Sequence, residues 1–324
     1  MSTPLLEVHD LVKHYPPRGF FSAGSAPVQA VNGVSFAIAE AETLGLVGES
    51  GCGKSTVGRA ILRLEEPTAG DVRFVGESIL EADNAALHRL RRQMQVVFQD
   101  PYSSLNPRMS VGRAIAEGME IHRLARAGEI PARVAALMVE VGLDPESAGR
   151  YPHEFSGGQR QRIGIARALA VQPRLLVCDE PVSALDVSVQ AQVVNLLADL
   201  QRDRRLAYLF IAHDLAVVRQ LAHRIAVMYF GRIVELGPAR TVIAAPKHPY
   251  TQALVSAVPS RVLERHADRI VLSGDPPGPT TVLPGCAFAS RCFHPRRDQR
   301  CHAERPTLRV IDGHQVACHH AEES

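Results

Sequence analysis

The sequence lacks an excess of charge of either sign. Its 324 residues include 36 Lys and Arg against 34 Asp and Glu, which leaves a net charge of +2. A protein held to nucleic acid or to an anionic membrane by bulk electrostatics would carry a much larger positive excess. We therefore expect no nucleic-acid partner.

Long apolar runs are also missing. The best of them, such as residues 206–212, have the length of a strand and fall far short of the roughly 18 residues that a membrane span requires. Glu7 and Asp10 interrupt the amino-terminal segment, where a signal peptide would need an unbroken apolar core. The sequence therefore predicts a cytosolic chain that does not itself cross a bilayer.

What is present is an alternation of apolar, strand-like runs with helical stretches. This pattern is typical of an α/β domain whose parallel strands are covered by helices. A β-rich amino-terminal section is expected at residues 5–8, 28–38 and 72–75. Further strands are expected at residues 43–47, 95–98, 175–178, 208–211 and 225–228.

Two further segments complete the expected organisation. Helical periodicity over residues 110–150 predicts a helical insertion that ends at Gly142. From Ala257 onward the chain becomes rich in proline, which predicts a linker to a small terminal module. We expect a main domain over residues 1–256, with a helical subdomain at about 105–170, and an extension over residues 257–324.

A glycine-rich segment follows the strand-like residues 43–47 and precedes a helix-compatible run. In such a loop, backbone amides converge on phosphate oxygens, Lys54 reaches the β and γ phosphates, and Ser55 offers a hydroxyl to Mg²⁺. A simple glycine-rich turn is the alternative, but the strand and helix on either side favour a P-loop. The predicted nucleotide site consists of Gly48, Glu49, Ser50, Gly51, Cys52, Gly53, Lys54, Ser55 and Thr56.

Two carboxylates end the apolar strand at residues 175–178. Asp179 is placed to hold Mg²⁺, directly or through water, and Glu180 to orient and deprotonate the attacking water. A solvated turn is the alternative for such a pair. Open α/β sheets bind ligands at the carboxyl ends of their strands, which favours the catalytic interpretation.

A second anion-binding helix end is predicted at residues 155–162, FSGGQRQR. Ser156 can cap the helix while Gly157, Gly158 and Gln159 offer unhindered amides. At this point the sequence resembles the ATP-binding-cassette (ABC) ATPases, whose signature motif these residues match. The resemblance covers roughly residues 5–255.

The resemblance implies further roles in the same order along the chain. It implies that Tyr15 stacks on adenine, that Gln99 is the Q-loop residue near Mg²⁺, and that His213 is the switch histidine. It assigns residues 183–186, including Asp186, to the D-loop. Taken singly, Tyr15 could be an ordinary aromatic, Gln99 a turn residue and His213 a core histidine. The resemblance also implies that Ser156 and Gly158 act on ATP held by an opposing subunit.

The segment HPYTQAL at residues 248–254 and the cysteine-containing tail resemble the ATPases of the oligopeptide and dipeptide importer branch. The opening LVKHYPP and the form GCAF resemble the second, or F, ATPase subunit of these systems. The resemblance implies a second ATPase subunit, two membrane permeases and an extracytoplasmic binding protein as partners. It places a groove for a permease helix in the segment after Gln99 and in the helical insertion. Related systems import nickel or glutathione, so the cargo stays open.

Four of the six cysteines lie in the tail with the spacing C-x5-C-x8-C-x16-C. This spacing matches neither zinc-finger pairs nor the bacterial ferredoxin run, and a reducing cytosol disfavours disulfides. Four thiolates suit Zn²⁺ or an iron–sulfur cluster, and the resemblance favours [4Fe–4S] on Cys286, Cys292, Cys301 and Cys318. Cys52 and Cys178 are interpreted as ordinary small residues. The arginines nearby are interpreted as a solvated face, namely Arg291, Arg296, Arg297 and Arg300.

These observations predict a transporter ATPase that uses ATP binding and hydrolysis to move its membrane partners. A soluble cassette ATPase acting on ribosomes or nucleic acid is the competing class. Such proteins usually carry two cassettes or a long coiled-coil insertion, and this sequence has one cassette and a short insertion. A P-loop kinase of small molecules conflicts with the SGGQ motif and His213.

Overall fold

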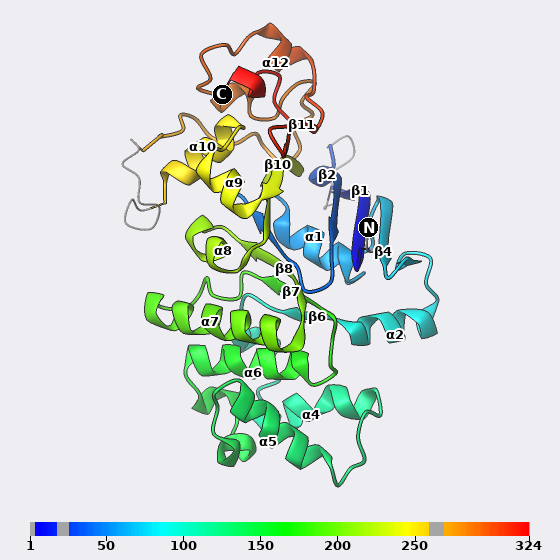
Figure 1. Cartoon of the computed structure of the whole chain (residues 1–324). Coiled ribbons are helices and arrows are strands. Elements are labelled where there is room, and N and C mark those ends of the chain that lie inside the picture. The colour runs from blue at the N-terminus through cyan, green and yellow to red at the C-terminus, as the bar shows by residue number, and fades with distance from the viewer. Residues whose placement is uncertain (1–3, 18–25, 259–268, 324) are drawn as a thin grey trace. The chain divides into compact units, whose positions relative to one another are not determined.

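The computed structural model describes residues 4–17, 26–258 and 269–323, and they form two compact units (Figure 1). The first unit comprises Met1–Ile38, Thr43–Leu80 and Ala212–Ser324, and the second comprises Ala39–Glu42 and Glu81–Ile211. The first three residues of the amino-terminal segment and residues 259–268 of the predicted linker lie outside the described part.

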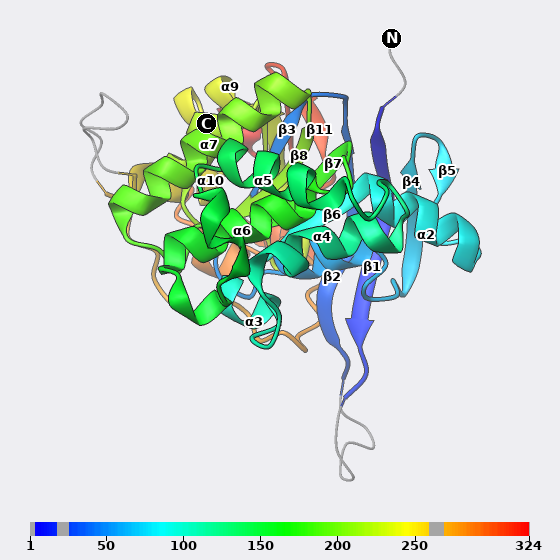
Figure 2. The same ribbon diagram turned by 90° about the horizontal axis from the view of Figure 1, so that it is seen from below.

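The first unit contains an antiparallel sheet of four strands in the order β2-β1-β4-β5. Its long strands β1, β2 and β4 lie side by side (Figure 2). Buried residues such as Leu6, Leu11 and Phe74 form its core face. The strands are β1 (Leu6–Tyr15), β2 (Val28–Ile38), β4 (Ala69–Phe74) and β5 (Glu77–Ser78).

A second set of strands in the first unit runs in the order β11-β12-β10-β9-β3. β3 and β9 pair in parallel, whereas β10, β12 and β11 extend the sheet in antiparallel fashion. These strands are β3 (Thr43–Val47), β9 (Arg224–Tyr229), β10 (Arg232–Pro238), β11 (Arg309–Ile311) and β12 (His314–Val316). The helices are α1 (Lys54–Ile61), α8 (Leu215–Leu221), α9 (Ala239–Ala244), α10 (Pro249–Ser256) and α12 (Gln299–Ala303).

The second unit is built on three parallel strands, β6, β7 and β8, whose order in the sheet places β7 in the middle. Every residue of β7 and β8 is buried, as expected for parallel strands covered on both faces. The strands are β6 (Met94–Val97), β7 (Leu175–Asp179) and β8 (Ala207–Ala212). The helices are α2 (Asn84–Gln93), α3 (Pro101–Ser104), α4 (Val111–Ile121), α5 (Ile130–Glu140), α6 (Gly157–Leu169) and α7 (Val187–Arg204).

The structure confirms the α/β class and the strands expected from the sequence. Residues 28–38 and 43–47 match β2 and β3 residue for residue, and the predicted insertion contains α4 and α5. The sequence analysis missed β5, β10, β11 and β12. Among the described residues, no helix combines the length and the apolar character that a membrane span would need.

A fully buried carboxylate on β10 joins three separate parts of the first unit. Glu235 is 0% exposed, and His314 on β12, at 1%, contacts it with Nδ1 at 2.9 Å from Oε1. The backbone amides of Lys247 and His248 donate to the same carboxylate, each at 2.9 Å. Because a buried carboxylate without donors is costly, these contacts fix β12 and the start of α10 against β10.

We therefore expect Glu235→Gln to lower the free energy of unfolding by about 1–3 kcal/mol, the usual cost of leaving a buried hydrogen-bonding group without its partner. The amide cannot accept from all three donors. Urea denaturation measures the change, with Glu304→Gln as control. Glu304 pairs with Arg300 on the surface, and the control should lose less than about 1 kcal/mol. Equal losses in the two variants would contradict the role of Glu235.

Candidate ATP site and cysteine cluster

The turn between β3 and α1 has the shape of a phosphate-binding loop. A side chain at Gly53, whose φ is +106°, would place its Cβ 2.0 Å from the carbonyl oxygen of Ala30. At Gly48 a Cβ would lie 2.1 Å from the carbonyl oxygen of Met228. These positions require glycine because neighbouring backbone crowds the loop. The amino-terminal end of α1 follows directly, and its amides favour an anion there.

Lys54 spans this loop from its buried position at the start of α1. Its Nζ donates to the carbonyl oxygens of Gly48, at 2.8 Å, and Glu49, at 3.0 Å. The ammonium therefore lies over the concave side of the loop, where phosphate oxygens would replace carbonyl oxygens as acceptors. Burial raises the pKa of the neighbouring Cys52 thiol, which keeps it protonated and uncharged at neutral pH.

Tyr15 lies at the end of β1 beside the first turn of α1. Its hydroxyl donates to Glu65, and Thr56 is a second hydrogen-bonding neighbour. Lys13 Nζ lies 4.9 Å from the ring centroid. The aromatic ring thus lies close to the phosphate-binding loop within the first unit, as a base-stacking role requires.

In the second unit, Asp179 and Glu180 follow the buried strand β7. Asp179 is 6% exposed, and Glu180 adopts a left-handed φ of +45°. Such a backbone is unfavourable for a glutamate and is found where the surrounding structure fixes it, often at active sites. Gln99 Nε2 donates to Glu180 Oε2 at 3.1 Å. Two predicted site residues separated by 81 positions are therefore brought together.

Ser156 caps the signature helix α6. Its Oγ accepts from the backbone amide of Gln159 at 3.3 Å, and Gln159 Oε1 accepts from the amide of Ser156 at 2.9 Å. This reciprocal capping box fixes the start of the helix. A Cβ on Gly158 would lie 2.4 Å from Cγ1 of Val189, so the glycine lets α6 pack closely on α7.

The last two nucleotide-site predictions fall at helix starts. Asp186 caps α7 by accepting from the amide of Val189 at 3.0 Å, and its hydrogen bond from Ser188 lowers its pKa. His213, between β8 and the cap of α8, is exposed. The alternative of a core histidine is therefore wrong for His213.

The four tail cysteines, 286, 292, 301 and 318, line one small enclosed cavity in the first unit. Burial, together with the nearby cysteines of the group, raises the pKa of Cys286 to about 12 and that of Cys318 to about 11. The shared cavity brings the four thiols close together, so thiolate charges on them would repel one another. A cation that binds thiolates would offset this penalty. Cys52 and Cys178 are buried elsewhere, as expected for small core residues.

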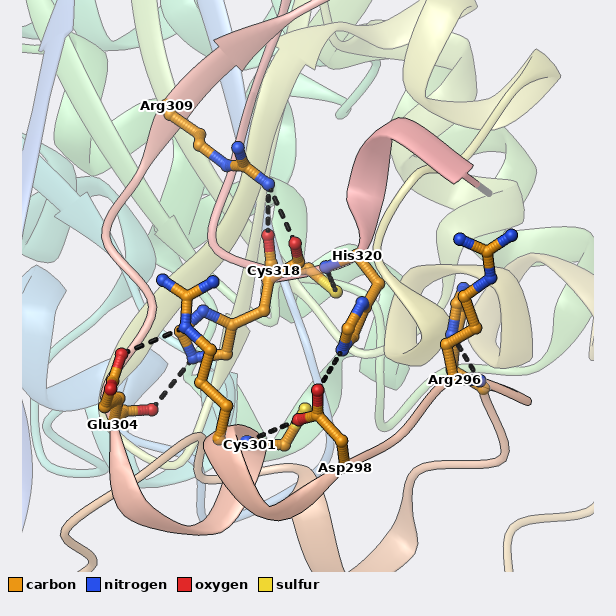
Figure 3. A network of polar contacts seen from close by, with 10 residues as sticks. Arg296, Asp298, Cys301, Glu304, Arg309, Cys318 and His320 are labelled. Atoms are coloured by element: carbon orange, nitrogen blue, oxygen red, sulfur yellow. Dashed lines mark hydrogen bonds and ion pairs between the residues drawn. The ribbon is translucent and has the colours of Figure 1, made fainter.

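Polar contacts organise the chain around this cavity (Figure 3). Asp298 caps α12 by accepting from the amide of Cys301 at 3.2 Å, and its other oxygen lies 3.5 Å from His320 Nε2. Arg309 donates to the carbonyl oxygens of Cys318 and His319, both at 3.1 Å. These bonds hold the segments that carry two of the cysteines.

One interpretation of the tail was wrong. Arg296, Arg297 and Arg300 are exposed, but Arg291 is 9% exposed and does not belong to a solvated face. Its Nη1 and Nη2 donate to the Glu49 carboxylate at 2.9 and 3.1 Å. The arginine is buried because its acceptor belongs to the phosphate-binding loop, 242 positions earlier, where charge counting along the tail could not find it.

Tyr250 is the other functional contact that the sequence analysis did not predict. Its hydroxyl accepts from the backbone amide of Glu49 at 2.8 Å. The only sequence signal was its position in the HPY segment, which served there as a mark of resemblance. Tyr250 itself is fully buried and packs on Tyr229 and Phe288.

A P-loop, an acidic strand end with its glutamine, and a serine-capped signature helix together define a nucleotide-binding ATPase of the ABC class. The sequence matches the family model for ABC transporters over residues 31–183. Two solved structures share the fold with TM-scores of 0.65. They are cbiO1 from Clostridium perfringens, 25% identical over 75% of this chain and 92% of that one, and the ATP-binding cassette MJ0796 bound to ADP and Pi, 27% identical over 72% and 99%.

More specific matches extend over nearly the full length of the chain. Residues 234–301 match the model of the oligopeptide/dipeptide transporter, C-terminal region. The di/tripeptide transport ATP-binding protein DppF of Pseudomonas aeruginosa is 50% identical over 98% of both chains. The putative oligopeptide transport ATP-binding protein YkfD of Bacillus subtilis is 50% identical over 98% of this chain and 95% of its own. The chain belongs to the ABC transporter ATP-binding proteins that carry this C-terminal region, and it is an ATPase subunit.

Removal of the Lys54 ammonium should weaken ATP binding. We expect Lys54→Ala to raise the dissociation constant for ATP roughly tenfold or more, because a charge-assisted hydrogen bond to phosphate is lost. Titration with a fluorescent ATP analogue measures the change. Lys247→Ala is the control, since Lys247 pairs with Asp312 away from the loop. Unchanged affinity in Lys54→Ala would contradict the placement of the phosphates.

Proposed function

We propose that this chain hydrolyses ATP to drive the import of dipeptides or oligopeptides through membrane permeases. The observation that carries the proposal is the joint presence of the ABC cassette and the C-terminal region, at 50% identity to peptide-transport ATP-binding proteins along nearly the full length. Nickel or glutathione remain as alternative cargoes. Uptake of labelled dipeptides by cells with and without the gene, in competition with glutathione and Ni²⁺, separates these cargoes.

The residues of the two units divide the chemistry between them. In the first unit, the loop amides, Lys54 and Ser55 bind the phosphates and Mg²⁺, and Tyr15 stacks on adenine. In the second unit, Asp179 and Gln99 are assigned to Mg²⁺, and Glu180 is assigned to accept the proton of the attacking water. The hydrogen bond from Gln99 to Glu180 supports this assignment because it aims the carboxylate. His213 contacts the γ-phosphate as the switch residue.

In this proposal a second ATPase subunit, a paralogue of this chain, completes each site. Ser156, Gly157, Gly158 and Gln159 offer the start of α6 to ATP held by the partner, and Asp186 contacts the partner beside it. The helix geometry supports this, because the capping box uses the amide of Gln159 and leaves the amides of Gly157 and Gly158 without an acceptor within α6. ATP binding closes the pair and hydrolysis reopens it.

Replacement of the proposed base tests the hydrolytic step. We expect Glu180→Gln to retain ATP binding and to reduce hydrolysis by roughly 10²–10⁴-fold, because an amide of the same shape cannot accept the proton. Phosphate release and equilibrium ATP binding are measured on one preparation. Glu146→Gln, at an exposed position near α5, is the control and should hydrolyse normally. Hydrolysis within a few-fold of wild type would exclude Glu180 as the base.

The segment after Gln99 is proposed to receive a permease helix. Asp100 caps α3, and Tyr102 is 59% exposed although it is a large aromatic. The guanidinium carbon of Arg160, on α6, lies 5.0 Å from the Tyr102 ring centroid. A permease helix that displaced Tyr102 would therefore also act on the signature helix. We propose that the chain is held at the cytoplasmic face of the membrane in this way, with the binding protein on the other side.

The four tail cysteines are proposed to hold a [4Fe–4S] cluster. Their sharing of one cavity supports a common ligand. Tetrahedral zinc, with Zn–S bonds of about 2.3 Å, would bring the sulfurs to about 3.8 Å of one another. Among the described residues, Asp298, Cys301 and His320 have potential ligand atoms that all lie within 4.8 Å of one another. Within this described part of the chain, no three of the four cysteine sulfurs lie that close together. A cluster bound by the four cysteines would hold the tail together.

Metal analysis of protein purified without oxygen tests this assignment. We expect about four iron and four sulfide per chain, the composition of one cluster bound by four cysteines. Replacement of Cys286, Cys292, Cys301 or Cys318 by serine should lower the iron content, whereas Cys52→Ser and Cys178→Ser should not. Colourless protein with one zinc per chain would refute the iron–sulfur assignment and keep the four-ligand site.

A further inference from the structure

Glu49 in the phosphate-binding loop is held at three places by three different residues. Its backbone amide donates to Tyr250 Oη at 2.8 Å, and its carbonyl oxygen accepts from Lys54 Nζ at 3.0 Å. Its carboxylate accepts two hydrogen bonds from Arg291. Two of these partners, Tyr250 and Arg291, come from the carboxyl-terminal part of the chain and lie outside the cassette motifs.

Arg291 is committed to this contact by its surroundings. It lies next to Cys292 in the chain, and its side chain is 8% exposed. Tyr229 Oη, at 3.4 Å, is a further acceptor, and the guanidinium carbon lies 6.0 Å from the Tyr229 ring centroid. Nε is buried and has no hydrogen-bond partner among the described residues. Glu49 is therefore the main compensation for a desolvated cation.

An aromatic group continues the connection toward the cysteines. Phe288, two residues after Cys286, packs edge-on against Tyr229 with ring centroids 5.2 Å apart. The same ring contacts Tyr250 at 5.5 Å. Phe288 also lines the cysteine cavity. The segment between Cys286 and Cys292 thus packs on both tyrosines that adjoin Glu49.

We propose that Arg291 is a positioning residue for ATP, which holds Glu49, and through it the phosphate-binding loop, from the cysteine-containing tail. The bidentate pair fixes a planar carboxylate in one orientation, which a lysine could not do equally well. Nucleotide affinity then depends on the folded state of the tail, and nucleotide binding stabilises the tail to the same extent. The inference rests on ATP binding by the loop and is independent of which metal the cysteines hold.

The test measures ATP binding by the full chain in which Arg291 or Glu49 has lost its charge. We expect Arg291→Gln to raise the dissociation constant for a fluorescent ATP analogue roughly tenfold, with unchanged metal content. Glu49→Gln reaches the same pair from the loop side, in case the tail of the first variant is disrupted. Arg300→Gln is the matched control, because Arg300 lies in the same tail but pairs with Glu304 at the surface.

A double-mutant cycle separates positioning from a general loss of structure. If the two residues act as one pair, Arg291→Gln combined with Glu49→Gln should bind ATP about as tightly as either single variant. The proposal would be overturned if the fold-change in the dissociation constant of the double variant were the product of the two single fold-changes. Wild-type affinity in both single variants would also overturn it. Failure of the wild-type chain to bind ATP would instead refute the nucleotide site itself, so the two failures are distinguishable.

Discussion

A loop that binds phosphate through its backbone amides has few amides left to hold its own shape. Its shape must be imposed from outside, and in this chain the surrounding backbone imposes it. Carbonyl oxygens of Ala30 and Met228 leave no room for side chains at Gly53 and Gly48. The amide of Gly231 donates to the carbonyl oxygen of Cys52 at 2.9 Å. The shape of the loop between β3 and α1 is therefore maintained by contacts with the antiparallel strands, the β9–β10 turn and the tail.

The tail is packed into the first unit and is not a separate module. Phe288, Tyr229 and Tyr250 form a buried aromatic group, and Glu235 draws β12 and the start of α10 onto β10. The aromatic contacts stabilise the packing by burying apolar surface. The Glu235 carboxylate fixes the orientation of the segments, because its lone pairs accept only from donors in suitable positions. The four tail cysteines and the glycine-rich loop thus adjoin one packed region of the first unit.

The sequence predicted those parts of the molecule whose signal is local. Strands β3, β7 and β8 are continuous apolar runs, and the glycine-rich loop and the SGGQ helix start are read from adjacent residues. The strand β10 was missed because a charged residue, Glu235, lies in its middle, and β11 and β12 have only three residues each. The Arg291–Glu49 pair was missed for a different reason. Its two residues are 242 positions apart, and the other arginines near Arg291 in the sequence indicated a solvent-exposed face.

The pairing of β12 with β10 also has a consequence for biosynthesis. His314 follows Glu235 by 79 positions, so at about 5–20 residues per second a ribosome would leave the edge of β10 uncovered for roughly 4–16 s. During that interval the edge of β10 is unpaired, and the Glu235 carboxylate lacks its contact with His314. Unpaired strand edges pair readily with other chains. The edge of β10 is therefore open to such pairing while residues 239–313 are being translated.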